Sequence, residues 1–300
     1  MLVGVHAFTE RFMFIQKQID CPYPTSLSHT VRAHGWVKLA PWHWDDDHNE
    51  LTRPELLETG RSVLVKVSQS NFESIIVQIN ADILMPTEHE SIKSIVKRWL
   101  SIDWDPSDAI RIATSVDQRV ALFIKHGGGR FLRGSTFYED LIKTICTINT
   151  NWASTRRMVL SLVNRLGEGV FPTPLEIISY GEDFLRKELR LGFRSRVIVE
   201  SSRQLLEKGF IDDRGNLVRR DLKFEDLIAL RGIGPYSASH LMMLTHDFGC
   251  IPIDSEVTRY CREHYDVEQE EIETFFQRWG KYRFLGYKLS RIVDDTNWTG

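Results

Sequence analysis

The stretch that decides the fold is Leu230-Arg231-Gly232-Ile233-Gly234-Pro235-Tyr236-Ser237-Ala238, with Ile251-Pro252-Ile253-Asp254 a little downstream. The first segment predicts two helices joined by a tight turn. We expect both glycines of this turn to adopt positive φ, which costs glycine no Cβ clash, and Ile233 to anchor in the core. Pro235 suits the first position of the second helix. The free N–H groups at the start of that helix predict a site for an anion such as a phosphate.

Asp254 is predicted to start a third helix. An aspartate before Ser255-Glu256-Val257 is a good N-cap, and capping alone would explain it. A carboxylate beside a phosphate site can also stabilise the cation-like transition state of a glycosidic bond that breaks at a sugar C1′. The two roles are compatible, and both remain open on the residues alone.

Around these segments the chain predicts an α+β protein with a domain boundary near residue 88. Residues 1–88 alternate in several places and form an α+β domain, whereas residues 89–300 show helical spacing. The strands expected in the first part are Phe8–Gln16, Gly35–Trp44, Ser62–Gln69 and Ile75–Ile79, with a helix over Ser26–His34. The helices expected in the second part include Phe137–Thr147, Ala153–Leu166, Phe193–Lys208, Phe224–Leu230, Pro235–His246, Ser255–His264 and Glu268–Phe284.

Composition narrows the class of protein. The 300 residues have a formal net charge of -3, so any surface for nucleic acid must come from local basic groups. The four cysteines are scattered without a CxxC pair, which predicts a reduced protein with no disulfide framework and no side-chain metal site. The chain has no apolar run long enough to predict a membrane span, and Met1–His6 lacks the basic start of a signal peptide. We therefore expect a cytoplasmic location.

The run Gly232–Ala238 through Pro252–Asp254 resembles the helix-hairpin-helix (HhH-GPD) DNA glycosylases of base-excision repair, in their 3-methyladenine and 8-oxoguanine branch. Phe137–Leu141, Ile148–Trp152, Phe171–Pro174 and Leu191–Arg196 are also similar to segments of that family. The resemblance covers roughly residues 88 to 300. It implies a two-lobed helical body with the active-site cleft between the lobes, behind an N-terminal antiparallel sheet.

The resemblance also implies roles for single residues. Asp254 would be the catalytic carboxylate, and the hairpin would bind a DNA phosphate, with Na⁺ or K⁺ on its carbonyl groups. A wedge and polar groups are needed where a base has been flipped out of the duplex. The implied DNA-binding hairpin residues are Arg231, Gly232, Ile233 and Gly234, and the implied gap-filling or orphan-base residues are Asn149, Asn151, Phe193 and Arg194. Loop capping and core packing are the alternative roles for Asn149 and Phe193.

This chain departs from the family's bifunctional members at Tyr236. They carry a lysine there, which forms an imine with the sugar, and a phenol cannot do so. We therefore expect base release by water and no lyase activity at the abasic site. Tyr236 and His240 instead resemble the aromatic pocket of enzymes for alkylated bases, although Tyr236 could simply pack on a helix face. No cysteine quartet follows Asp254, so no iron–sulfur cluster is expected.

Together these features predict a monofunctional DNA glycosylase that removes a damaged, alkylated purine flipped out of double-stranded DNA. Two alternatives stay open. One is an 8-oxoguanine-type enzyme, favoured by Asn149 and Arg194, and the other is a catalytically silent protein that binds damaged DNA. We expect a nucleoid-associated monomer that needs no cofactor.

Overall fold

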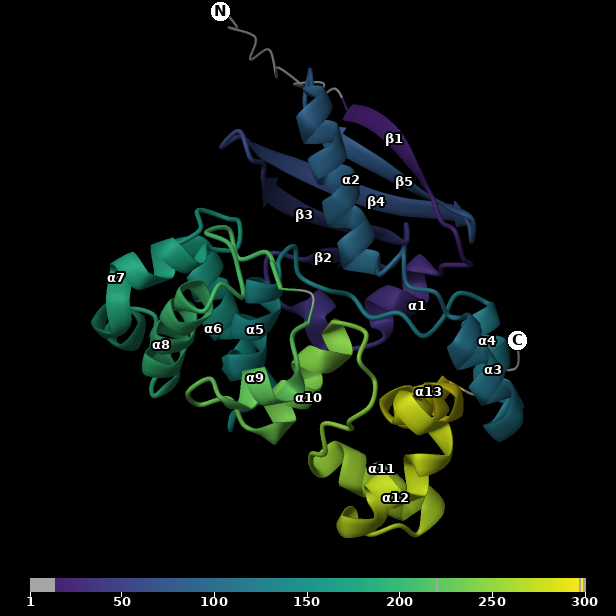
Figure 1. Cartoon of the computed structure of the whole chain (residues 1–300). Helices are drawn as coiled ribbons and strands as arrows, with labels where there is room; N and C mark the ends of the chain where they lie inside the picture. Colours follow the sequence, from purple (N-terminus) through teal and green to yellow (C-terminus); the bar gives the residue numbers. More distant parts are fainter. Residues whose placement is uncertain (1–13, 220, 297, 299–300) are drawn as a thin grey trace, which may run out of the picture.

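A five-stranded antiparallel sheet, with one helix across its face, stands on a helical body in the computed structural model, which describes residues 14–219, 221–296 and 298 (Figure 1). The strand order is β1-β5-β4-β3-β2. The strands are β1 Phe14–Asp20, β2 His43–Asp45, β3 Glu50–Leu56, β4 Ser62–Asn71 and β5 Ser74–Asn80. The α+β class with an N-terminal antiparallel sheet is confirmed.

The sheet forms where buried and exposed positions alternate. In β4 the residues Val63, Val65 and Val67 are buried while their neighbours face outward, as the alternation predicted. The strand expected over Gly35–Trp44 is wrong. Gly35–Lys38 forms a short 3₁₀ helix, η1, and only the last residues of that stretch enter β2. Of the strand expected over Phe8–Gln16, residues 8–13 lie outside the described residues and the rest begins β1.

The helices follow the sheet in chain order. They are α1 Leu27–Arg32 within the sheet domain, then α2 Pro86–Leu100, α3 Ser107–Val116, α4 Gln118–Lys125, α5 Phe137–Thr147, α6 Trp152–Arg165, α7 Pro174–Lys187, α8 Arg194–Glu207, α9 Phe224–Ile228, α10 Pro235–Leu244, α11 Ser255–Tyr265, η2 Gln269–Glu271, α12 Ile272–Phe275, η3 Phe276–Tyr282 and α13 Arg283–Thr296.

The end of the chain forms several helices where the sequence predicted one. The single helix expected over Glu268–Phe284 is divided into η2, α12 and η3, and a further helix, α13, follows. Gly280 interrupts the helical geometry with φ 56° and ψ −125°, a conformation open to glycine but costly for other residues. The chain turns there, and this turn directs α13 back onto the body.

The helical body has two lobes. Helices α5 to α10 make one lobe, while α3, α4 and α11 to α13 make the other (Figure 1). Helix α13 packs against α4, and η3 packs against α3, so the end of the chain completes a lobe that starts before residue 130. The segment between α10 and α11 crosses from one lobe to the other.

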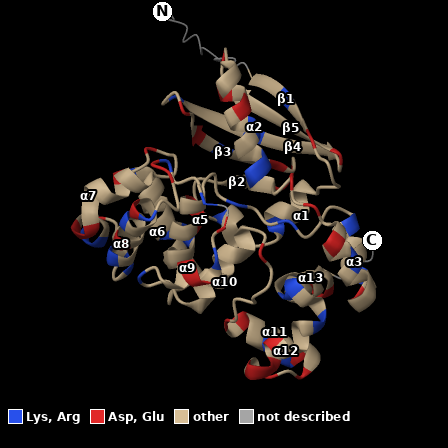
Figure 2. Ribbon diagram, in the orientation of Figure 1, with Lys and Arg blue, Asp and Glu red and all other residues tan. Residues whose placement is uncertain are grey.

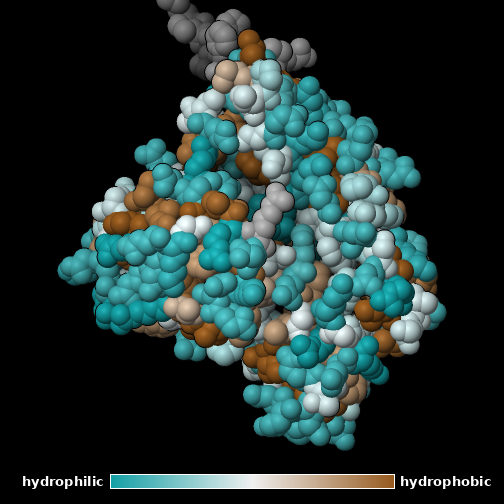
Figure 3. Space-filling model, in the orientation of Figure 1, coloured by the Kyte–Doolittle hydropathy of each residue, from teal (hydrophilic) through white to brown (hydrophobic). Residues whose placement is uncertain are grey.

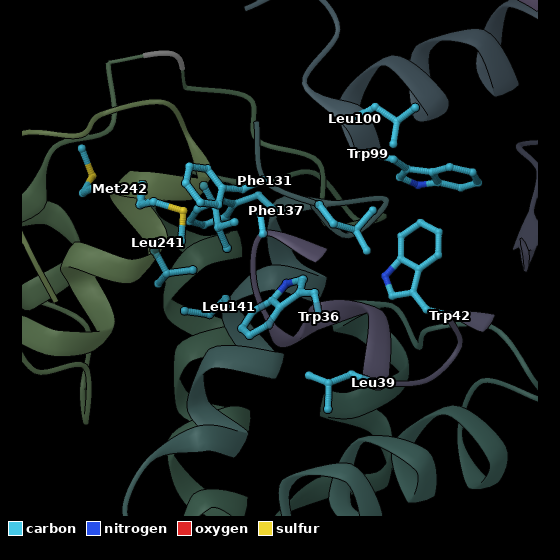
Figure 4. Packing of buried hydrophobic residues seen from close by; sticks show 14 of the residues in the cluster. Trp36, Leu39, Trp42, Trp99, Leu100, Phe131, Phe137, Leu141, Leu241 and Met242 are labelled. Carbon is cyan, nitrogen blue, oxygen red and sulfur yellow. The ribbon is translucent and has the colours of Figure 1, made fainter. Parts of the chain in front are cut away.

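The sheet domain is joined to the body by aromatic packing. Trp36 and Leu39 lie near Leu141 of α5, and Trp42 meets Trp99 of α2 edge-on at 4.9 Å between ring centroids (Figure 4). The Nε1–H of Trp36 donates to Asp140 Oδ1 at 3.0 Å, which fixes the orientation of its ring. The core is therefore continuous from the sheet into both lobes. None of the helices in the described ranges has the length and apolar character needed to cross a membrane.

Candidate active site

The predicted hairpin is present between α9 and α10. Gly232 adopts φ +77°, and a Cβ built on it would lie 2.7 Å from Cγ2 of Val197. Backbone conformation and close packing therefore both require glycine here. Ile233 is buried, as expected for the anchor of the turn.

Gly234 behaves differently from the prediction. It is the N-cap of α10 with φ −94°, so the expectation of positive φ at both glycines is wrong for this one. A Cβ on Gly234 would meet no atom within 4 Å, and no side chain caps the start of α10. The hairpin therefore presents an open backbone surface at a helix N-terminus, the geometry that suits a phosphate.

Arg231 ties the hairpin to α8. Its Nε lies 3.0 Å from Glu200 Oε2, and Arg196 donates to the other carboxylate oxygen at 2.8 Å. The backbone N–H of Arg231 donates to the Gln204 side chain at 3.2 Å. These contacts position the turn, while the guanidinium itself stays exposed.

Asp254 caps α11 with one oxygen only. Its Oδ1 accepts the N–H groups of Glu256 and Val257, both at 2.9 Å, and the residue is exposed. Oδ2 accepts no hydrogen bond from the residues that the structure describes, which leaves it available to a ligand. Capping and catalysis are thus compatible at this carboxylate, as predicted.

Asp254 lines a cavity of about 780 Å³ at the junction of the two lobes. The walls come from η1, α5, α6, α10, α11 and α13, and they combine aromatic rings with charged side chains. Tyr236 is stacked on His240 at 6.2 Å between ring centroids, and His240 lies 4.9 Å from Trp36. The structure therefore brings the predicted pocket residues Tyr236 and His240 together with Asp254 in one site.

The titratable side chains of this cavity are perturbed. Burial, with the nearby Lys288 charge, lowers the pKa of His240 to about 4, so its ring is neutral at pH 7. Its Nε2 is buried and has no hydrogen-bond partner among the described residues. Burial and the negative charge of Asp254 raise the pKa of Tyr236, which keeps the phenol protonated. A ligand here would meet neutral aromatic rings together with carboxylates at the start of α11 and cationic side chains from α13.

Sequence reasoning missed two members of the site. Trp36 stood in a predicted strand, and Lys288 lies on α13, which was not expected as a separate helix. Burial lowers the pKa of Lys288 to about 8, although the charge of Asp254 opposes the shift. The signal available in the sequence was the spacing of Phe284, Lys288 and Arg291, which places all three on one helix face.

The predicted gap-filling residues gather at another corner. Asn149 is exposed with φ 46°, and Phe193, at the start of α8, is 51% exposed. Arg194 is buried beneath the Phe193 ring at 4.6 Å and donates to the backbone carbonyls of Ile148 and Asn149. Asn151 uses its side chain to cap α6, accepting the Ser154 N–H at 2.9 Å. Arg194 thus positions the loop, and the DNA contacts of all four stay predictions.

The surface charge is uneven. In Figure 2 the ribbon of α11 and α12 carries several acidic positions. By contrast, Lys38, Arg156 and Arg157 border a hollow of about 410 Å³ beside the site, and none of them forms an ion pair within the described ranges. Hydrophobic residues form separate patches on the face seen in Figure 3. Among the residues that the structure describes, no three His, Cys, Asp or Glu side chains are placed to hold a metal ion.

Comparisons with known proteins agree with this geometry. No family model matches the chain. An N-glycosylase/DNA lyase of Saccharomyces cerevisiae is 30% identical over 43% of this chain, and the match spans only 40% of the yeast protein. Among solved structures, a 3-methyladenine DNA glycosylase from Archaeoglobus fulgidus superposes with a TM-score of 0.72 at 18% identity, over 94% of this chain and 100% of that one.

An 8-oxoguanine glycosylase/lyase from Clostridium acetobutylicum, solved with double-stranded DNA, gives a TM-score of 0.66 at 17% identity, over 95% and 99% of the two chains. Both structures extend over nearly the whole chain, the sheet domain included. The protein therefore has the fold of the helix-hairpin-helix DNA glycosylases, in the form shared by the 3-methyladenine and 8-oxoguanine enzymes.

Proposed function

We propose that the protein is a DNA glycosylase of base-excision repair, which breaks the N-glycosidic bond of a damaged base flipped out of double-stranded DNA. The observation that carries the proposal is the position of Asp254. Its Oδ1 accepts backbone hydrogen bonds at the start of α11, and its side chain lines the cavity between the lobes beside Tyr236 and His240. A flipped base is recognised by stacking in such a pocket.

The chemistry follows from this arrangement. As the base leaves, positive charge develops on the sugar, and a fixed carboxylate stabilises it. Asp254 holds that negative charge beside the cavity, while Trp36, Tyr236 and His240 stack on the base. The open backbone at Gly234 binds a phosphate of the same strand, and Lys38, Arg156 and Arg157 attract the DNA. The protein acts as a monomer and needs no cofactor, with Na⁺ or K⁺ at the hairpin carbonyls.

An alkylated purine is the first substrate we propose. Such a base carries positive charge, and electron-rich aromatic rings attract it. The neutral His240 ring adds no repulsion. The Archaeoglobus fulgidus structure with this fold is named for 3-methyladenine.

An oxidised purine is the second candidate, because Lys288 supplies a partly protonated amine to the same cavity. A cation disfavours a cationic base and suits the carbonyl oxygen of a neutral one. The relatives named for 8-oxoguanine and for a lyase belong to this alternative.

Base release by water is the expected route. Tyr236 occupies the hairpin position from which an amine would attack, so the hairpin itself provides no imine and no lyase activity. Strand cleavage would need an amine from another element.

A lesion panel with the variant Asp254→Asn tests the proposal. Duplexes carrying single damaged purines are incubated with the protein, and alkali then reveals abasic sites. We expect Asp254→Asn to lower base release by about 10²–10³-fold, while DNA binding persists because asparagine caps a helix nearly as well as aspartate.

Asp213→Asn is the matched control. Asp213 is exposed and lies on the connection between α8 and α9. Its variant should release the base at the parental rate. Full activity in Asp254→Asn would refute the assignment, and tight binding to abasic DNA without release of any base would identify a silent damage-binding protein.

A further inference from the structure

Lys288 is a half-buried amine that the proposed base release leaves without a role. It lies in the middle of α13 and lines the cavity that contains Asp254. Its Nζ makes no hydrogen bond and no ion pair with the residues in the described ranges. An amine that loses hydration on folding and gains no partner destabilises the protein, unless a ligand uses it.

The neighbouring carboxylates Glu256 and Asp295 do not neutralise Lys288, because both pair with Arg291. Arg291, on the next turn of α13, is already committed to Glu256 at 3.2 Å, to Asp295 at 3.4 Å and to the Tyr287 hydroxyl at 3.2 Å. Lys288 is close enough to His240 to lower its pKa, and Asp254 is close enough to Lys288 to act on it in turn. The amine is thus held between the proposed base pocket and the proposed catalytic carboxylate.

We propose that Lys288 is a nucleophile that gives the protein abasic-site lyase activity, in place of the lysine that the hairpin lacks. The inference rests on the proposed function, since the cavity must receive the sugar of a flipped nucleotide. Tyr236 stands at the position of α10 where the bifunctional enzymes carry a lysine, so α10 supplies no amine. Helix α13, in the opposite lobe, supplies the amine of Lys288 to the same cavity. The expectation of a purely monofunctional enzyme, which considered the hairpin alone, is revised by this inference.

The reaction balances without an oxidant, a reductant or a metal. The neutral Nζ of Lys288 attacks C1′ of the ring-opened abasic sugar, and the adduct takes a proton from solvent and loses one water to give a protonated imine. A proton then leaves C2′ for solvent, the C3′–O bond breaks, and the downstream strand departs with a 5′-phosphate. Water hydrolyses the imine, which frees Lys288 and leaves an unsaturated aldehyde on the upstream strand.

Burial favours Lys288 over the other lysine of the cavity. Lys38 also lines the cavity, but it is exposed. The lowered pKa of Lys288, about 8, leaves a useful fraction of neutral amine near pH 7, as is typical of lysines that form imines. Its position in the cavity and its lowered pKa therefore both favour Lys288 as the nucleophile.

The test is borohydride trapping on a duplex that already contains an abasic site. Sodium borohydride reduces the imine to a stable amine, which joins protein and DNA. We expect a covalent adduct with the parental protein, mapped by peptide mass to Lys288, and its loss in Lys288→Arg and Lys288→Met. Arginine preserves the charge but forms no imine. Lys125→Arg, at an exposed lysine of α4 that does not line the cavity, should retain the adduct.

Two further measurements separate a lost nucleophile from a lost fold or a wrong function. Lys288→Arg should bind a duplex with a tetrahydrofuran abasic analogue, which has no aldehyde, as tightly as the parental protein. Base release from the lesion panel reports the proposed function by itself. Base release without an adduct would overturn the lyase inference alone, whereas an adduct on preformed abasic DNA without release of any base would overturn the glycosylase proposal alone. An adduct that survives Lys288→Arg, or that maps to Lys38, would also overturn the inference.

Discussion

The protein places two lysines in different environments, one buried where the sheet meets the body and one half-buried in the cavity between the lobes. Lys143 of α5 lies 2.6 Å from Glu139 Oε1, and Arg53 of β3 donates to the same carboxylate at 2.9 Å. Glu55 Oε1 lies 2.5 Å from Arg53 Nε, and we call Arg53, Glu55, Glu139 and Lys143 the seam cluster. Lys288 has no such partner in the described ranges.

The difference separates structure from function. Burial lowers the pKa of Lys143 and of Lys288 alike, although Glu139 opposes the shift at Lys143. A perturbed pKa therefore does not distinguish the two sites. Pairing does, because the seam cluster satisfies its charges internally, whereas the cavity keeps an amine and the His240 Nε2 available for a ligand.

The largest effect is expected from breaking the seam cluster. Glu139→Gln leaves Arg53 and Lys143 buried without a full counter-charge, and should lower the free energy of unfolding by about 3–5 kcal/mol. Urea denaturation measures the loss. Glu188→Gln, at a side chain 55% exposed, is the matched control and should change stability by less than about 0.5 kcal/mol.

Acid gives an independent check of the seam cluster. Although burial opposes it, the charges of Arg53 and Lys143 lower the pKa of Glu139 from 4.5 to about 2 in the folded protein. This contribution is present above pH 4.5 and is lost as the pH falls from 4.5 toward 2. A parental protein as stable at pH 3 as at pH 6 would contradict the role given to the cluster.

Substitutions at the two hairpin glycines should lower stability less than Glu139→Gln does, and the two positions should differ from each other. Gly232→Ala places a side chain at positive φ against Val197, and we expect a loss of about 1–3 kcal/mol of stability. Gly234→Ala meets no neighbour and should fold normally. A bulkier residue at Gly234 should weaken DNA binding without unfolding the protein, measured by fluorescence anisotropy beside a thermal melt. Equal melting losses at both positions would contradict the open backbone surface.

The smallest effect on stability is expected at the cavity lysine, and its sign is reversed. Because the fold holds the pKa of Lys288 near 8, below the ordinary 10.5, the amine destabilises the protein at neutral pH. Lys288→Met should raise the free energy of unfolding by about 1 kcal/mol. A loss of stability in Lys288→Met as large as that in Glu139→Gln would show that Lys288 has a structural role like that of the seam cluster.

Most of the features that could be predicted from the sequence depend on residues that are close to one another in the chain. The hairpin and Asp254 depend on neighbours within a few residues, so glycine, proline and cap chemistry were sufficient to place them. Strand β3 could not be found this way, because its inward positions include Arg53 and Glu55, which break the expected hydrophobic alternation. The carboxylate of Glu139, which pairs with Arg53, lies on α5, far along the chain.

Lys288 shows the same limit at the site. Its position depends on the turn at Gly280 and on packing of α13 against α4, neither of which a local pattern reveals. The Tyr236 argument was sound for the hairpin alone. It could not include an amine brought from a separate lobe.

The way Asp254 begins α11 has a consequence for how proteins with this fold diverge. The helix requires only an acceptor oxygen from this side chain, and an amide provides one as well as a carboxylate. Exchanging one oxygen for an NH₂ group would thus remove the negative charge and leave the architecture intact. Under the proposed function, this one substitution would turn a repair enzyme into a protein that finds the same lesions and holds them.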